Sequence, residues 1–139
     1  VREASRFEIP VICHIYPREA TTGKILYTPE DIAWAVRCAV EVGADVVKVP
    51  YCGEVQAYGQ IVADSPVPVV AAGGPQSSSL LAALEMIAQV VRSGALGATI
   101  GRNIWGCERM TAALRAFKAV IHDGSSAVEA LAAAEAGGD

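Results

Sequence analysis

Four short, uninterrupted apolar runs alternate with longer amphipathic stretches along this 139-residue chain. A strand covered on one face alternates apolar and polar residues, whereas a strand in a parallel sheet is covered on both faces and is apolar throughout. The runs here are of the second kind, and each precedes a stretch with helical periodicity. We therefore predict an α/β fold built on a parallel sheet. The predicted strands span residues 7–17, 44–50, 67–74 and 97–101.

Helices are predicted after each strand, and several of their ends carry recognisable capping residues. Thr28 is a predicted N-cap, and Gly43 ends the same helix. The serine run at 77–79 offers a cap for the third helix. Trp34 and Trp105 lie in or beside helices and are predicted to be packing residues. The predicted helices span residues 28–43, 54–63, 79–94, 107–122 and 125–139.

The spacing of these units favours one half of an eight-stranded barrel. Lys48, Gly73 and Gly101 stand at predicted strand ends and recur at intervals of roughly 25 to 30 positions, close to the ~31 residues that each unit of a (β/α)8 barrel uses. Four units at that pitch take up nearly the whole chain. A doubly wound domain is the alternative, but its first turn should carry a GxGxxG sequence, and the turn here reads YPREATTG.

The chain is interpreted as a single partial domain that spans residues 1–139. Residues 1–6 are expected to be the end of a preceding helix or loop. Residues 123–139 are expected to form a C-terminal helix with a frayed Gly-Gly-Asp tail. Because the first residue is valine rather than methionine, we expect that a segment upstream was lost or removed.

Composition excludes several classes of protein. The net charge is −4 and the cationic residues are scattered, whereas a nucleic-acid surface would show a basic stripe. No apolar run reaches the roughly 18 residues that a membrane span needs, and no signal-peptide pattern is present. The four cysteines form no CxxC pair and no metal-ligand spacing. We expect free thiols, no metal, no nucleic-acid or membrane partner, and a cytoplasmic location.

Glycines and polar residues collect where the predicted strands end, which is the catalytic face of a barrel. Gly73 and Gly74 follow the third strand, and Gly101 and Arg102 follow the fourth. Glycine lets backbone N–H groups approach an anion closely, and a guanidinium adds positive charge. The pattern indicates a phosphate site, although ordinary tight turns would have the same sequence. Ser77 is a further candidate for a phosphate contact.

Lys48 stands in the otherwise apolar run GADVVKVP, so its stem must lie among valines. One structural interpretation is that the amine extends to water at the strand end, and another is that it pairs with an acid. The functional interpretation is a Schiff-base lysine, because a desolvated amine loses its proton more easily and only the neutral form attacks a carbonyl.

Three residues near the end of the first strand are candidate site residues. Tyr16 is able to donate or accept a proton, or it simply caps the barrel mouth. His14 lies two positions earlier, on the same side of the strand, and is either a core histidine or a substrate contact. Arg18 follows the strand and is a possible substrate contact.

Four motifs in register, HIYPR, GADVVKVPY, PVPVVAAGGP and GATIGRNIW, resemble the archaeal-type (DhnA-type) class I fructose-bisphosphate aldolase family over about residues 7–122. The resemblance implies a TIM barrel of which this chain holds strands five to eight, the C-terminal half. It implies a cofactor-free lyase of glycolysis and gluconeogenesis. In such an enzyme Lys48 forms an iminium with a ketose phosphate and Tyr16 assists proton transfer. Gly73, Gly74, Gly101 and Arg102 hold the phosphate.

The chain departs from that family because the first four strands, with a catalytic aspartate, are absent. The leading hypothesis is a fragment of a Schiff-base aldolase that cleaves fructose 1,6-bisphosphate to dihydroxyacetone phosphate and an aldehyde. A same-family amino-dideoxy-heptulosonate synthase or a thiolase for the phosphorylated autoinducer-2 breakdown product would use the same lysine. A hypothesis of another class is an inactive half-barrel that self-associates, and a homo-oligomer is expected in either case.

Overall fold

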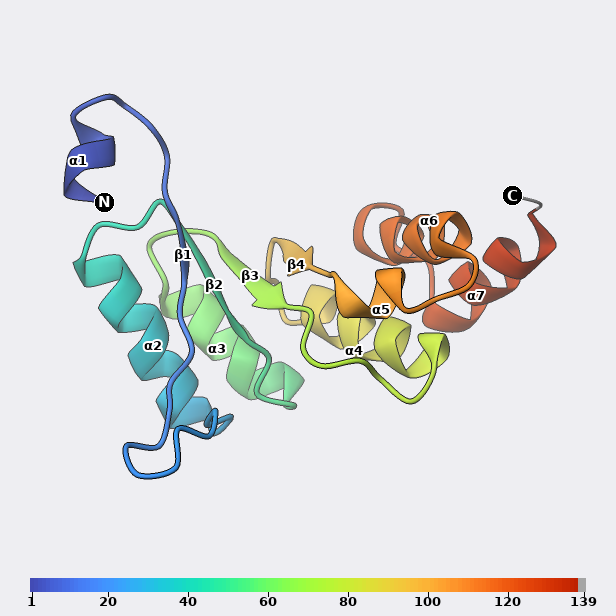
Figure 1. The fold of residues 1–139 in the computed structure, drawn as a ribbon, viewed down its shortest axis with the longest axis horizontal. Coiled ribbons are helices and arrows are strands. Elements are labelled where there is room, and N and C mark those ends of the chain that lie inside the picture. Colours follow the sequence, from blue (N-terminus) through green and yellow to red (C-terminus); the bar gives the residue numbers. More distant parts are fainter. Residues whose placement is uncertain (138–139) are drawn as a thin grey trace.

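The computed structural model describes residues 1–137 and contains a four-stranded parallel sheet. The strands follow one another in space in the order of the sequence, and each pairs in parallel with the next. Figure 1 shows the helices that connect successive strands. Consecutive parallel strands joined by helices are the arrangement that the alternating pattern predicts. The strands are β1 (Ile12–His14), β2 (Val46–Pro50), β3 (Val69–Ala72) and β4 (Gly97–Thr99).

Three long helices connect the strands, and others lie at the two ends of the chain. The predicted caps at Thr28 and Ser79 are confirmed, because their side chains accept from the backbone N–H groups of Asp31 and Ala82. Gly43 has a φ of 85°, which glycine adopts without strain. The helices are α1 (Arg2–Ser5), α2 (Pro29–Glu41), α3 (Val55–Asp64), α4 (Leu80–Arg92), α5 (Arg102–Trp105), α6 (Met110–His122) and α7 (Ala127–Ala136).

The interior consists of two apolar clusters. The first lies between the sheet and the helices α2 and α3, where Val47 and Val49 of β2 are fully buried. The second joins α4, α6 and α7, with Leu84 and Phe117 among its buried residues, and lies at the far end of the molecule from α2 (Figure 1). Burial of this apolar surface is the main contribution that holds the sheet and its helices together.

The opposite face of the sheet is open among residues 1–137. Ile12 is 55% exposed and His14 is exposed, while Cys13 between them is half-buried. Side chains alternate between the faces of a strand, so Ile12 and His14 share the open face. His14 is therefore exposed on this face within the described residues. In the described part of the chain β1 and β4 each pair with a single neighbour, so both edges of the sheet are free.

Several local expectations were wrong. The first strand spans only Ile12–His14 rather than 7–17, because Glu8 has a φ of 54° and Pro10 has no N–H to donate to a ladder. The short helix α5 was not expected at all. Trp34 and Trp105 are 71% and 74% exposed, so neither packs in the interior.

The last described helix, α7, ends at Ala136. Residues 138–139 of the expected frayed tail lie outside the described residues. No helix within residues 1–137 combines the length and the apolar character that a bilayer crossing requires.

Candidate active site

A cavity of about 180 Å³ lies at the carboxyl ends of the strands. It brings together six residues that were predicted from the sequence as site residues, from four separate segments of the chain. Two further residues, Thr99 and Trp105, complete its lining. In parallel α/β folds ligands bind at this end of the sheet. The six predicted residues in the lining are Tyr16, Lys48, Gly73, Gly74, Gly101 and Arg102.

Lys48 is directed to the cavity by its position in β2. Its neighbours Val47 and Val49 are fully buried against the helices, so alternation places the side chain of Lys48 on the open face. The strand is fixed on both sides, since Lys48 pairs with His14 of β1 and Val70 of β3. Lys48 is half-buried, so residues 1–137 do not supply the enclosed, water-poor surroundings that a Schiff-base lysine is expected to need.

The turn after β3 requires glycine for two different reasons. A Cβ at Gly73 would lie 2.8 Å from the carbonyl oxygen of Thr99 and 2.9 Å from the Cα of Ile100, both backbone atoms. Only a residue without a side chain allows the ends of β3 and β4 to approach so closely. Gly74 has a φ of 68°, in the left-handed region that other residues adopt at a cost.

Arg102 links the two glycine turns at the surface of the cavity. Its Nη2 donates to the carbonyl oxygen of Gly74 at 2.8 Å, and its side chain is exposed. The guanidinium has further donors beyond the one used in this bond. A Cβ at Gly101 would lie 3.3 Å from the ring of Trp105, so the indole covers this turn. A cation, an aromatic surface and two backbone turns thus surround the same small space.

Sequence reasoning assigned no role in the site to three residues of this region. Thr99 is exposed and lines the cavity, and its place opposite Ala72 in the ladder follows from strand register. Trp105 lies one helical turn after Gly101, but α5 was not predicted. Asn103 is only 5% exposed, follows the Gly101 turn in the chain, and bonds through its side chain to the backbone of Gly73 and Ser77 in the other turn. An asparagine two residues after a glycine turn, a residue type whose side chain readily bonds backbone groups, is the one signal that the sequence offered.

Three predicted contact residues do not line the cavity. Arg18 donates from Nη1 to the carbonyl oxygen of Gly23 at 2.7 Å and so is bonded within its own loop. Ser77 lines a neighbouring cavity of about 190 Å³, and its backbone N–H donates to Oδ1 of Asn103 at 2.7 Å. His14 lies on the open sheet face, beside Lys48 in the register.

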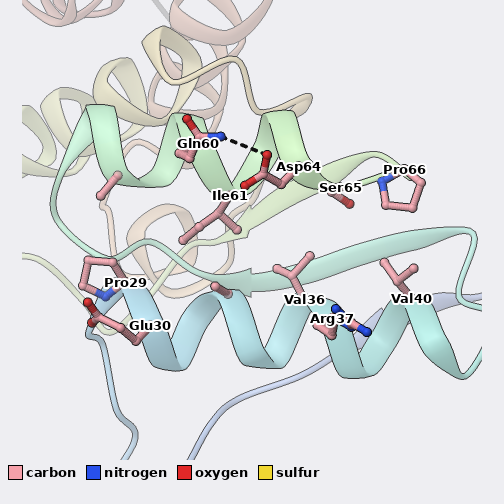
Figure 2. A pocket seen from close by; sticks show the side chains of 12 residues that line it. Pro29, Glu30, Val36, Arg37, Val40, Gln60, Ile61, Asp64, Ser65 and Pro66 are labelled. Carbon is pink, nitrogen blue, oxygen red and sulfur yellow. Dashed lines mark hydrogen bonds between the residues drawn. The ribbon is translucent and has the colours of Figure 1, made fainter.

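A larger cavity of about 530 Å³ lies on the outside, between α2 and α3 (Figure 2). Its walls are mainly apolar side chains such as Val36 and Ile61. The polar groups on its rim include Asp64, which accepts from the side-chain amide of Gln60 at 2.9 Å. The cavity lies on the helical side of the sheet and none of the six gathered site residues lines it, so it is not the candidate site.

Burial raises the pKa of two tyrosine hydroxyls elsewhere in the structure. The phenol of Tyr58, fully buried, has a pKa well above its ordinary value because desolvation disfavours the phenolate. Burial raises the pKa of Tyr51 in the same way, and its hydroxyl donates to Oε1 of Gln89 at 3.0 Å. Their rings meet edge to face with centroids 5.1 Å apart. Both are structural residues of the first cluster rather than acids or bases.

Comparison with known proteins places this chain in a family. Residues 1–106 match the family model described as DeoC/LacD family aldolase. Fructose-bisphosphate aldolase class 1 of Thermoproteus tenax is 33% identical over 133 residues, 94% of this chain and 49% of the relative. The 2-amino-4,5-dihydroxy-6-oxo-7-(phosphonooxy)heptanoate synthase of Streptomyces griseus is 37% identical over 137 residues, 95% of this chain and 48% of the relative.

Solved structures agree with these relatives. An archaeal fructose 1,6-bisphosphate aldolase superposes with a TM-score of 0.81 at 33% identity, over 88% of this chain and 49% of that one. A Schiff-base-forming fructose-1,6-bisphosphate aldolase superposes with a TM-score of 0.80 at 32% identity, over 87% and 48%. The expected fold, half of a TIM barrel, is thereby confirmed. The chain spans about half the length of the relatives it matches, and it belongs to the DeoC/LacD family of aldolases.

Proposed function

We propose that this chain carries the Schiff-base and phosphate-binding half of a class I aldolase that acts on a ketose phosphate such as fructose 1,6-bisphosphate. The observation that carries the proposal is the single cavity lined by Lys48, Tyr16, both glycine turns and Arg102. Relatives described as fructose-bisphosphate aldolases cover most of the chain and support the same activity. The activity further requires that the rest of the barrel enclose this cavity, because Lys48 is only half-buried within residues 1–137.

In the proposed reaction the neutral amine of Lys48 attacks the C2 carbonyl of the ketose, and loss of water gives an iminium. The C3–C4 bond then breaks, and its electron pair moves to the iminium nitrogen to leave an enamine. The phenolic oxygen of Tyr16 relays the proton that leaves the C4 hydroxyl as the aldehyde departs. A proton returned to C3 regenerates the iminium, and water releases dihydroxyacetone phosphate and free Lys48.

The phosphate is proposed to bind between the two glycine turns. Backbone N–H groups of Gly74 and Gly101 are proposed to donate to it, since neither residue has a side chain of its own in the way, and Arg102 supplies charge-assisted hydrogen bonds. Lys48 and the residues proposed to bind the phosphate line the same 180 Å³ cavity. Anchoring the phosphate there therefore holds C2 of the substrate at a fixed distance from the amine of Lys48. Correct placement of two reacting groups is a large part of what an active site contributes.

A substrate panel tests the proposal. The protein for this test is a chimera in which the first half of the Thermoproteus tenax relative precedes this chain, because that relative is twice as long. We expect cleavage of fructose 1,6-bisphosphate with release of dihydroxyacetone phosphate. The Streptomyces griseus relative favours a second candidate, synthesis of a phosphorylated amino-heptulosonate. If the chimera forms the amino-heptulosonate but does not cleave fructose 1,6-bisphosphate, the synthase is the correct assignment. If it catalyses neither reaction, both candidate functions are refuted.

Arg102→Ala in this chimera is expected to raise KM for the phosphorylated substrate about 10- to 100-fold, since a hydrogen bond to a charged group contributes roughly 1.5–3 kcal/mol. Steady-state kinetics measures the change. Arg18→Ala is the matched control, because the Arg18 side chain is bonded to Gly23 outside the cavity. Equal changes in KM for the two variants would remove Arg102 from the proposed phosphate site.

We also propose that the 139-residue chain on its own self-associates through the two free edges of its sheet, so that the open sheet face becomes the inside of a closed barrel. A two-fold axis along the barrel would pair β4 of one copy with β1 of another, and both strands are three residues long. Ile12, 55% exposed on this face, would then be buried. Light scattering should report a dimer, weakened by Ile12→Lys but not by Val128→Lys on α7. A monomer at all concentrations would contradict this association.

A further inference from the structure

Asn103 is a buried polar side chain that lies between the two glycine turns. Its side-chain Nδ2 donates to the carbonyl oxygens of Gly73 and Pro75, each at 3.1 Å. Its Oδ1 accepts from the backbone N–H of Ser77 at 2.7 Å. Carbonyls only accept and a backbone N–H only donates, so these partners fix the orientation of the amide. One side chain therefore holds three backbone groups of the segment 73–77.

These bonds cross from one βα unit to the next. Asn103 belongs to α5, after β4, whereas its partners follow β3. Beyond the β3–β4 ladder, the turns themselves are also joined by the Gly73 N–H to Thr99 carbonyl bond of 2.9 Å and by the exposed contact of Arg102 with Gly74. Of these side-chain links only that of Asn103 is shielded from water, and a buried hydrogen bond resists exchange with solvent more than an exposed one.

We propose that Asn103 is a positioning residue that joins the two turns into one preformed anion site. The inference rests on the proposed phosphate-binding function and adds to it the residue that sets the separation of the turns. Asn103 does not line the cavity of Lys48, so it acts through the backbone of Gly73 and Pro75, on either side of Gly74, rather than by touching the substrate. The ligand class is a phosphomonoester, with inorganic phosphate as the smallest probe.

Phosphate titration of the 139-residue chain is the first test. Asn103→Leu keeps the branched shape and the number of heavy atoms of the side chain and removes all three hydrogen bonds. We expect its Kd for inorganic phosphate to rise at least about tenfold. The control is Ile32→Ala, a fully buried residue of α2 in the other core cluster, which loses stability but should bind phosphate within twofold of the unmodified chain. Unchanged binding in folded Asn103→Leu, or an equal loss in Ile32→Ala, would overturn the inference.

Amide exchange supplies a readout that does not depend on phosphate. In Asn103→Asp the acceptor for the Ser77 N–H remains, while a carboxylate oxygen faces the carbonyls of Gly73 and Pro75. We expect the Gly73 amide to exchange at least about tenfold faster, with the Val47 amide, bonded to the Pro68 carbonyl at 2.9 Å, unchanged as a reference. An unaltered Gly73 amide would refute the role of Asn103.

The two readouts separate failure of this inference from failure of the proposed function. If the unmodified chain binds no phosphate, the proposed phosphate site is wrong, while the exchange measurement still decides whether Asn103 joins the turns. If the chain binds phosphate and both Asn103 variants behave as the unmodified chain does, the function stands and the positioning role is refuted. Should Asn103→Leu fail to fold, Asn103→Asp decides by exchange alone.

Discussion

Lys48→Met is expected to lower the aldolase activity of the chimera by at least about a thousandfold, because the reaction loses its nucleophile. Methionine preserves the length and the apolar stem of the side chain, so the fold of β2 should be unaffected. Lys48→Arg is expected to be equally inactive, since a guanidinium keeps the charge but does not lose its proton. Rates with fructose 1,6-bisphosphate, and circular dichroism to show that each variant is folded, measure these effects.

The sequence provides good controls for this experiment. The only other lysines are Lys24 and Lys118, both exposed and neither in the lining of the cavity. Lys24→Met and Lys118→Met should retain the activity of the unmodified protein. A Lys48→Met variant that is folded and still active would remove the iminium from the mechanism.

Gly73→Ala is expected to destabilise the chain by about 1–3 kcal/mol or more. The added methyl group would lie 2.8 and 2.9 Å from backbone atoms of Thr99 and Ile100, so the ends of β3 and β4 would have to separate. Because that separation also displaces the turn after β3, the affinity for phosphate should decrease together with the stability. Urea unfolding followed by circular dichroism measures the first effect, and phosphate titration measures the second.

Gly74→Ala distinguishes steric contact from backbone strain. A Cβ at Gly74 would meet no atom within 4 Å, but its φ of 68° is unfavourable for alanine. The expected cost is about 1–2 kcal/mol, with the strands left in place. If Gly73→Ala were as stable as the unmodified chain, the close approach of β3 to β4 would not be a constraint on this position.

The order of the elements was predictable from the sequence because it depends on short-range patterns. Apolar runs and helical periodicity gave the βα order, and capping chemistry gave the helix starts at Thr28 and Ser79. The extent of β1 was not predictable, since it depends on which neighbour pairs with each residue. The Glu8 and Pro10 segment is apolar enough to suggest a strand but is shaped by turn geometry instead.

The candidate site was predictable where a residue's place follows from strand alternation. Lys48 lies between two buried valines, so its face and its end of the sheet could be derived without coordinates. Asn103 and Trp105 could not, because their contacts depend on how two loops far apart in sequence lie against each other. The exposure of Trp34 and Trp105 shows that residue type alone does not decide burial.

The half-buried state of Lys48 was also beyond sequence reasoning, because it depends on which parts of a barrel are present. The described sheet covers one side of the amine and leaves the other open. A relative of twice the length has further chain that is available to cover it. This is why the kinetic experiments use the chimera, whereas phosphate binding and amide exchange use the chain alone.

Reductive trapping tests most directly whether Lys48 forms the covalent intermediate. The chimera is incubated with dihydroxyacetone phosphate, reduced with borohydride and digested, and the modified peptide is sequenced by mass spectrometry. The account predicts one adduct, on the peptide that contains Lys48, and none on those with Lys24 or Lys118. An active protein that yields no adduct, or an adduct at either of the other two lysines, would contradict it.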